Sequence, residues 1–414
     1  ASGDTVSLAS GASQTGFGRT GTVDWQTTKK TASFTAVSGE GYFIDTSSSA
    51  ITMTLPASPS AGDIVGLNDY ARNFGTNNLT VARNGSNIQG SANNGTFSTD
   101  GQSAMFVYVD ATQGWIPTED QSTTMYGAKY ITATGGTITT VCTNFKVHTF
   151  TGPGTFTVTC AGNSGGSNTV DYMVIAGGGG GGQGPSSPPE NGGGGGAGGY
   201  RESSGAASGC YTRSPLGACV AALPVTAQGY PITVGGGGAG KSSPARGDTG
   251  SNSIFSTITS SGGGGGGTQS NSGLAGGSGG GGGTPSAGGG SGNSPPVSPA
   301  QGKDGGDGVA AGGGGGGGAG TAGTVGGPGG FGGVGGQGVT TSITGSSVGR
   351  AGGGAGGTCR GNPPLPVPDG GGASGIPAES GGTNTGGGGG AASPPRSNSG
   401  AGGSGIVVIR YKFQ

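Results

Sequence analysis

The stretch Thr169-Val-Asp-Tyr-Met-Val-Ile-Ala-Gly-Gly-Gly-Gly-Gly-Gly182 decides the fold. Residues 170–176 are mostly β-branched, aromatic or apolar, so they predict a strand that leads directly into a backbone without side chains. The chain closes on a second clear strand, residues 406–413, which again follows glycine. We expect these two strands to share one small sheet, so that the glycine-rich segment between them begins and ends on the same base.

Glycine runs recur throughout that segment, and the chain holds 111 glycines in 414 residues without a Gly-X-Y period, which excludes collagen. The longest runs are 177–182, 192–196, 235–238, 262–267, 279–283, 312–318 and 386–390. Ordering glycine costs about 1–2 kcal/mol per residue, so ordered runs must pair their backbone groups with neighbouring backbones. Extended threefold helices packed side by side achieve this pairing, and only glycine lets the backbones come close enough. The sequence therefore predicts a bundle of polyglycine II helices.

Composition limits both the core and the partners. Only 29% of residues are hydrophobic and 8% charged, so a conventional core cannot extend throughout. Seventeen basic and 18 acidic residues give a net charge of -1 without a basic cluster, which argues against nucleic acid. No apolar stretch approaches membrane-spanning length, so we expect no membrane insertion. The polar N-terminus has no signal-peptide pattern, so export by the ordinary secretory route is unsupported.

Four regions follow from the pattern. Residues 1–24 are small and polar and are interpreted as a connector. Residues 25–120 contain short strand-like pieces separated by turn residues, which predicts a compact β module. Residues 121–168 are expected to form a β-hairpin connector region, and residues 169–414 the glycine-rich domain. Because no region has a sustained 3.6-residue period with caps, the fold class is all-β with little α-helix.

Several motifs resemble structural proteins of tailed bacteriophages. In the first half, the motifs are Ile51-Thr-Met-Thr-Leu-Pro-Ala-Ser-Pro-Ser-Ala-Gly-Asp-Ile-Val65, Asn77-Asn-Leu-Thr-Val81 and Tyr108-Val-Asp-Ala-Thr-Gln-Gly-Trp115. This half resembles a β module of phage tail fibres. The second half resembles the glycine-rich domain of the same proteins through Val147-His-Thr-Phe-Thr151, Tyr230-Pro-Ile-Thr-Val-Gly235 and the strands around the glycine runs.

The resemblance implies host recognition. Adhesins of this type carry packed polyglycine II helices with variable distal loops that touch the host surface. It implies a virion protein, located on a tail fibre or another surface appendage, that binds a bacterial receptor, either a glycan or an outer-membrane protein, and contacts other virion proteins. We expect a homo-oligomer, with a trimer as one option.

The segments between glycine runs collect most prolines together with aromatic and basic residues. Proline stiffens a loop, and Tyr or Arg supplies contact area and hydrogen bonds. We therefore expect receptor contacts from the loop residues Tyr200, Arg201, Tyr211, Arg213, Arg246, Arg360 and Arg396. The alternative, that these loops are simple turns between helices, stays open.

Two short motifs carry little weight. Residues 235–242 match a phosphate-loop pattern after a strand, but Pro244, Gly247 and Gly250 argue against the helix that such a loop must open. In a glycine-rich chain the match is close to chance. The tripeptide Arg246-Gly247-Asp248 resembles an integrin-binding sequence and is too short to decide anything.

The sequence offers few candidate catalytic residues. The single histidine, His148, sits in an alternating strand, where a structural role is expected. Asp304 and Asp307 are separated by two glycines, which favours a turn over a calcium site. We predict no enzyme, no cofactor and no metal, although a carboxylate pair for glycan hydrolysis assembled in space stays open.

Five cysteines are too widely spaced for a zinc signature. Cys142 and Cys160 flank an expected hairpin around Pro153, and Cys210 and Cys219 bracket a short loop, so both pairs are disulfide candidates outside a cell. In a reducing cytoplasm all five stay thiols, and Cys359 has no candidate partner.

Two other functions remain as alternatives to the adhesin. A purely structural fibre or capsid-decorating protein would use its loops only to contact neighbouring subunits. A polyglycine ice-binding protein would need a flat, regular face, which the Pro-rich loops disfavour.

Overall fold

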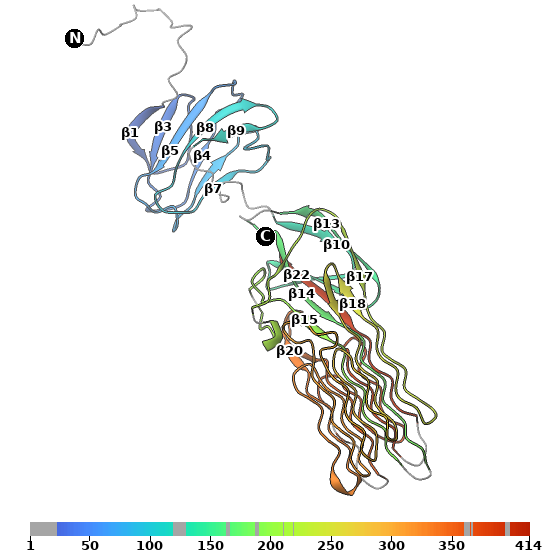
Figure 1. The fold of residues 1–414 in the computed structure, drawn as a ribbon. Coiled ribbons are helices and arrows are strands. Elements are labelled where there is room, and N and C mark those ends of the chain that lie inside the picture. The colour runs from blue at the N-terminus through green and yellow to red at the C-terminus, as the bar shows by residue number, and fades with distance from the viewer. Residues whose placement is uncertain are drawn as a thin grey trace, which may run out of the picture. The chain divides into compact units, whose positions relative to one another are not determined.

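The fold was analysed on a computed structural model that describes residues 23–118, 130–162, 166–186, 190–209, 211–217, 219–359, 365, 367–393 and 398–414. These residues form many short strands, two 3-10 helices of three residues and no α-helix. The prediction of an all-β chain with little helix is confirmed. The chain divides into two units, with the boundary near Tyr130 (Figure 1).

The first unit is built from two sheets, between which the first six strands alternate. One sheet has the order β1 (Asp24–Lys30), β3 (Glu40–Ile44), β5 (Ile64–Asp69), β8 (Ser103–Asp110) and β9 (Gly114–Pro117). The other has the order β2 (Phe34–Thr35), β4 (Ile51–Thr54), β6 (Leu79–Ala82) and β7 (Gly95–Phe97). The parallel pairs β1·β3·β5 and β2·β4·β6 show that the chain winds between the sheets.

The core of this unit lies between the two sheets. Strand β4 alternates buried and half-buried residues, so Ile51 and Met53 point into the core. Trp115 and Phe106 are fully buried against them in the same cluster. The period-two pattern of the sequence therefore places the apolar residues inside, as expected for strands that bury one face.

The second unit begins with two further sheets. The first has the order β10 (Ile131–Thr134), β13 (Gly154–Ala161), β17 (Gly229–Thr233), β18 (Ser253–Phe255) and β19 (Ile258–Ser260). The second has the order β11 (Thr137–Val141), β12 (Phe145–Phe150), β22 (Ile406–Lys412), β14 (Thr169–Ile175) and β15 (Tyr200–Glu202), with β16 (Leu223–Pro224) also on β14. A separate hairpin joins β20 (Val339–Thr341) to β21 (Val348–Arg350).

Strands β14 and β22 are antiparallel neighbours, with Ile175 opposite Ile406, so the prediction that they share one sheet is confirmed. Both strands are buried almost throughout, because the second sheet is covered on both faces. Val174 and Val407 belong to the cluster on one face, and Met173 to the cluster on the other. Burial on both faces explains why these strands are continuous apolar runs.

Within residues 121–168 the structure describes a β-hairpin of β11 and β12, but not the one expected around Pro153, and the region is not a separate connector. Strands β10 to β13 are integral to the two sheets of the second unit. Strand β12 pairs with β11 and β22, whereas β13 pairs with β10 and β17. Strands β12 and β13 therefore lie in different sheets although they follow each other in the chain. Phe150 and Phe156 both pack into the core between those sheets. The turn at 151–153 therefore crosses between layers.

The glycine runs extend from these sheets as a bundle of extended chain segments, which we call threads (Figure 1). Along residues 177–183, every third backbone N–H donates to the same neighbouring segment. Residues 177, 180 and 183 donate to segment 245–251, residues 178 and 181 to segment 400–403, and residues 179 and 182 to segment 193–196. A period of three identifies extended threefold helices, which is the polyglycine II packing that the sequence predicts.

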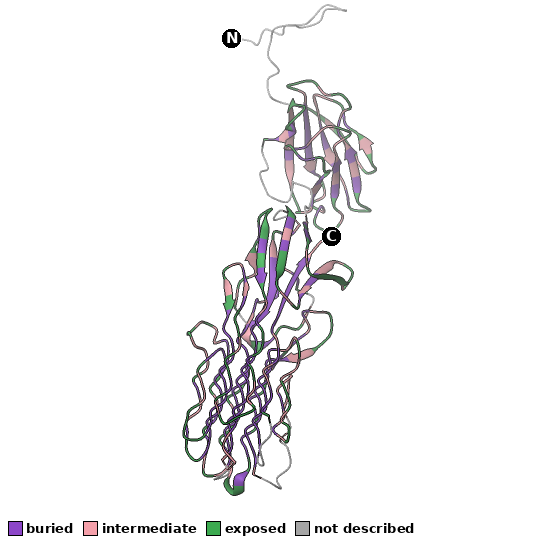
Figure 2. Cartoon of the chain, turned by 90° about the vertical axis from the view of Figure 1, so that its right-hand side faces the viewer, coloured by how far each residue is buried: buried purple, intermediate pink, exposed green. Residues whose placement is uncertain are grey.

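This central helix is enclosed on all sides. Besides the three segments that accept its N–H groups, segments at 263–266, 238 and 389–392 donate to its carbonyl oxygens. Most glycines of runs 177–182 and 312–318 are fully buried, and Figure 2 shows buried residues along the interior threads. A bundle whose interior helices hold almost no apolar side chains is thus ordered by hydrogen bonds between backbones.

Candidate functional site

The glycine-rich bundle has two ends with different surroundings. The strand end is formed by the sheets of the second unit, one of which contains both β14 and β22. The distal end is the opposite one, formed by the turns at 241–246, 268–272, 328–331 and 375–378. The 3-10 helix η3 (Pro328–Gly330) marks it, in orange, at the extremity of the bundle in Figure 1.

Four of the predicted contact residues lie at the strand end, so their expected place in distal loops is corrected. Tyr200 and Arg201 are in β15, which pairs with β14. Tyr200 is 1% exposed and cannot touch a partner. Tyr211 and Arg213 follow in the same segment, where Thr212 exchanges backbone and side-chain hydrogen bonds with Ser342. Each glycine run crosses the bundle once. The second run therefore returns the chain to the sheets, and this places Tyr200 and the residues after it at the strand end.

Tyr200 belongs to a buried polar network centred on Glu202, which is 1% exposed. The Tyr200 hydroxyl donates to Glu202 Oε2 at 3.0 Å, and the Ser214 backbone N–H donates to the same oxygen at 2.9 Å. Thr341 Oγ1 donates to Glu202 Oε1 at 2.7 Å. Burial raises the pKa of the Glu202 carboxyl, and these hydrogen bonds oppose the rise. The network ties β15 to β20 and to the loop that holds Ser214.

A second buried network surrounds Asp171, which lies opposite Arg410 in the β14·β22 pair. Ser203 Oγ donates to Asp171 Oδ1 at 2.7 Å and Ser208 Oγ to Asp171 Oδ2 at 2.6 Å. The Arg410 guanidinium lies 4.9 Å from the ring centre of Tyr211 and donates to the Ile343 carbonyl at 3.1 Å. These contacts clamp the loop after β15, so the strand end has a structural role.

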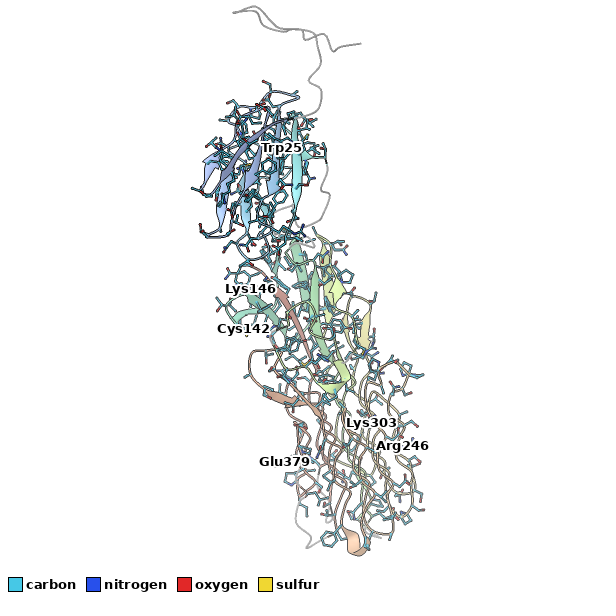
Figure 3. All side chains as sticks on the ribbon, turned by 90° about the vertical axis from the view of Figure 1, so that its left-hand side faces the viewer. Trp25, Cys142, Lys146, Arg246, Lys303 and Glu379 are labelled. Atoms are coloured by element: carbon cyan, nitrogen blue, oxygen red, sulfur yellow. The ribbon has the colours of Figure 1, made fainter. Side chains whose placement is uncertain are left out.

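Arg246 is the predicted contact residue that the structure places at the distal end, where it is exposed. Its Nη2 donates to Asn271 Oδ1 at 3.5 Å, and nearby Lys241 pairs with Asp248 at 2.6 Å. Figure 3 shows Arg246, Lys303 and Glu379 on the surface of the glycine-rich bundle. Arg360 and Arg396 lie outside the described residues.

Sequence reasoning missed an exposed face that runs along the bundle from the distal end toward β20. Phe331 directly follows η3 and is 45% exposed, and Val334 and Gln337 follow it at intervals of three. Because a threefold helix repeats its direction every three residues, these side chains share one outward face. The spacing of three within a glycine run is the signal that could have revealed this face.

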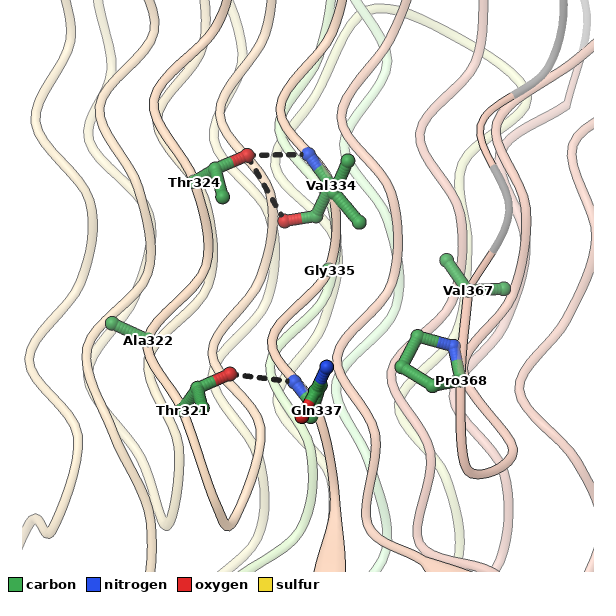
Figure 4. Close-up of a pocket in the computed structure, with 8 residues that line it drawn as sticks. All are labelled: Thr321, Ala322, Thr324, Val334, Gly335, Gln337, Val367 and Pro368. Carbon is green, nitrogen blue, oxygen red and sulfur yellow. Dashed lines mark hydrogen bonds between the residues drawn. The ribbon is translucent and has the colours of Figure 1, made fainter.

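Beside this face lies a groove of about 440 Å³, which we call the flank groove (Figure 4). Its lining residues are Thr321, Ala322, Thr324, Val334, Gly335, Gln337, Val367 and Pro368. The floor is the helix with Val334 and Gln337, and the threonines stand on one wall. Thr324 Oγ1 accepts the Val334 N–H at 2.6 Å, and Thr321 Oγ1 accepts the Gln337 N–H at 2.8 Å. The threonines therefore bond the floor where no further helix covers it.

The remaining motifs have structural roles. Residues 235–241 form an extended thread of the bundle, with Gly238 N–H donating to the Gly178 carbonyl, so the phosphate-loop match has no helix to open. Asp304 and Asp307 accept the backbone N–H groups of Gly292 and Gly289 on an adjacent antiparallel helix. The two aspartates are thus surface acceptors three residues apart, and the expected turn between them is corrected.

His148 is fully buried and stacks on Tyr411. Its Nδ1 bonds the Gly135 carbonyl at 2.7 Å and its Nε2 the Tyr411 hydroxyl at 3.0 Å. Burial lowers the pKa of the imidazole. No described residues gather three metal-ligating side chains, and within the same ranges no helix has the length and apolarity to cross a membrane.

The candidate disulfide between Cys142 and Cys160 is not formed. Both are exposed thiols. Cys142 precedes β12 and Cys160 lies in β13, and these strands belong to different sheets, so the assumed hairpin does not bring them together. Cys219 is also an exposed thiol, and Cys210 lies outside the described residues.

A family model described as a glycine-rich domain matches residues 149–412. This match covers well over half of the chain. The chain belongs to this glycine-rich domain family. The matched segment starts within β12 and ends with β22, so in this member the glycine-rich domain consists of the bundle and most of the strands on which it stands. Among curated proteins, none matches the chain.

Proposed function

We propose that this glycine-rich domain protein is a tail-fibre type adhesin of a phage virion, and that its distal end attaches to a bacterial surface. The observation that carries the proposal is the contrast between the two ends of the bundle. At the strand end, Asp171, Glu202 and Arg410 are buried, and each forms hydrogen bonds within the chain, although the Nε of Arg410 has no partner among the described residues. At the distal end, Phe331, Arg246 and Ile376 are exposed.

The bundle suits this role because it is held by many short hydrogen bonds between neighbouring threads. Gly179 donates to the Gly196 carbonyl at 2.8 Å, and Gly196 donates to the Gly264 carbonyl at 2.8 Å. Such a lattice fixes the ends of every turn, so the distal loops lose little freedom when they bind a partner. Exposed aromatic and basic side chains on fixed loops are typical anchors of protein interfaces.

The proposal places the protein on a tail fibre or other virion appendage, as a homo-oligomer in contact with other virion proteins, and without catalytic activity. A purely structural fibre is the competing function. It shares the rigid bundle and differs only in having no receptor. The two are separated by attachment to cells.

The test is a binding assay of fluorescently labelled full-length protein on a panel of bacterial strains. A distal variant, Phe331→Ala with Arg246→Ala, is compared with Arg213→Ala, an exposed arginine at the strand end. We expect the parent and Arg213→Ala to bind at least one strain equally, and the distal variant to bind at least tenfold more weakly. Equal binding of both variants would reject the distal end as the attachment site, and absence of binding to every strain would favour the structural fibre.

A further inference from the structure

The lining of the flank groove is neutral and partly polar. Its lining contains two threonines and one glutamine, and no ionisable side chain. A ligand with a phosphate, carboxylate or ammonium group would lose water there without gaining a charged partner, which is unfavourable. The groove therefore favours an uncharged ligand.

On one side of the groove, polar side-chain groups remain available for hydrogen bonds to a ligand. Gln337 is exposed, and its side-chain amide bonds no other described residue, so it offers an acceptor and two donors. Thr321 Oγ1 already accepts the Gln337 N–H at 2.8 Å, which leaves its hydroxyl hydrogen to donate outward. These groups lie side by side at one end of the floor (Figure 4).

Apolar surface makes up the rest of the lining. Val334 rises from the floor one threefold repeat away from Gln337, about 9 Å along the axis at ~3.1 Å per residue. Val367 and Pro368 form the opposite wall, facing the floor in Figure 4. The groove thus offers hydroxyl and amide groups beside flat aliphatic surface, over a length greater than one small ring.

An extended peptide is a poor occupant because the backbone of the floor is already paired. The Val334 N–H is bonded to Thr324 Oγ1, and the Val334 carbonyl accepts the Thr324 N–H at 3.0 Å. The Gln337 N–H is bonded to Thr321 Oγ1, and the Gln337 carbonyl accepts the Gly320 N–H at 2.9 Å. A peptide that adds to an edge needs free backbone groups. The backbone N–H and carbonyl groups of Val334 and Gln337 are therefore not free to pair with a peptide.

We propose that the flank groove binds a neutral oligosaccharide. A pyranose ring has an apolar C–H face and an edge of hydroxyl groups, which match the Val334 and Pro368 surface and the Gln337 amide with the Thr321 hydroxyl. Planar amides accept and donate to neighbouring hydroxyls at the same time. A volume of about 440 Å³ is within the usual range for small-ligand sites. This inference deepens the proposed function, on which it rests for the source of the sugar, a glycan of the host surface.

The test uses the full chain on an array of immobilised neutral hexose and N-acetylhexosamine oligosaccharides, with sialylated and phosphorylated sugars on the same array. The best neutral sugar is then titrated by calorimetry. Gln337→Ala removes the free amide, and Thr340→Ala is the matched control, because Thr340 is exposed three residues further along, in β20 and outside the groove.

We expect selective binding of neutral sugars, at least tenfold weaker binding by Gln337→Ala and unchanged binding by Thr340→Ala, with equal melting temperatures. No retained neutral sugar, preference for the anionic sugars, or parent-like affinity of Gln337→Ala would overturn the inference. If the parent attaches to cells but binds no sugar on the array, the groove is rejected as a sugar site and the adhesin function is kept. Array binding without attachment to any cell would reject the adhesin function and leave the groove standing.

Discussion

The backbone N–H of Gly179 donates to the carbonyl oxygen of Gly196 at 2.8 Å, across two antiparallel threads of the bundle. One threefold turn later, the next such bond joins the same two threads. This repeat explains how a segment with few apolar side chains is ordered. Each added turn pairs backbone groups that would otherwise be buried without a partner, at a cost of about 1–3 kcal/mol for each such group.

Acid should destabilise the second unit through His148, the only histidine of the chain. Burial holds the pKa of its imidazole below the ordinary value of 6.5, so the folded protein binds this proton less readily than the unfolded chain. Stability from this group is complete above about pH 6.5 and is lost as pH falls toward the folded pKa. Urea unfolding between pH 8 and pH 5 should show the loss, with a slope of at most about 1.4 kcal/mol per pH unit. In His148→Gln the share of the slope that comes from this imidazole should be lost, so stability should fall less between pH 6.5 and 5 than in the parent. An unchanged slope would contradict the assignment.

Removal of Asp171 should loosen the loop after β15. In Asp171→Ala, the Ser203 and Ser208 hydroxyls and the Gly205 N–H lose their shared acceptor inside the protein. We expect a loss of about 3 kcal/mol in unfolding free energy and faster proteolysis within residues 203–217. Glu379→Ala, at an exposed position, is the control and should behave like the parent. Parent-like stability of Asp171→Ala would show that the network does not clamp the loop.

Cys142 and Cys160 should both react with iodoacetamide in the folded, unreduced protein, because each thiol is exposed and their strands lie in different sheets. Mass spectrometry of the digested protein should find both residues alkylated. Recovery of a peptide pair linked through Cys142 and Cys160 would contradict the sheet assignment of β12 and β13.

The parts of the fold that sequence predicts are those with a local signal. The apolar run at 170–176 and its counterpart at 406–413 are recognisable as strands, and the glycines after the first and before the second indicate a common base. The spacing of Pro153 between two strands indicates a reversal of the chain, but it carries no information on which sheet receives each strand. Phe150 and Phe156 flank the expected hairpin in sequence, but they lie in different sheets and meet in the core between them.

The candidate site depends on relationships that no local pattern encodes. The flank groove exists because Thr321 aligns with Gln337, and Thr324 with Val334, on antiparallel threads. That register is set by packing over the whole bundle. The position of Tyr200, in contrast, was predictable by counting, because two glycine runs separate it from the sheet and two crossings return the chain to its base.

The central claim is that close approach of backbones holds the bundle together, and a pair of glycine variants tests it. A Cβ at Gly315 would overlap the carbonyl oxygen of Val334, whereas a Cβ at exposed Gly236 would meet nothing within 4 Å. Gly315→Val should therefore force threads apart and lower the unfolding free energy by about 3 kcal/mol or more through unpaired backbone groups. Gly236→Val should match the parent within about 1 kcal/mol. The direct measurement is the urea unfolding free energy of the two variants beside the parent. A large loss in Gly315→Val alone is the predicted result, and parent-like stability of Gly315→Val would contradict the packed-helix account.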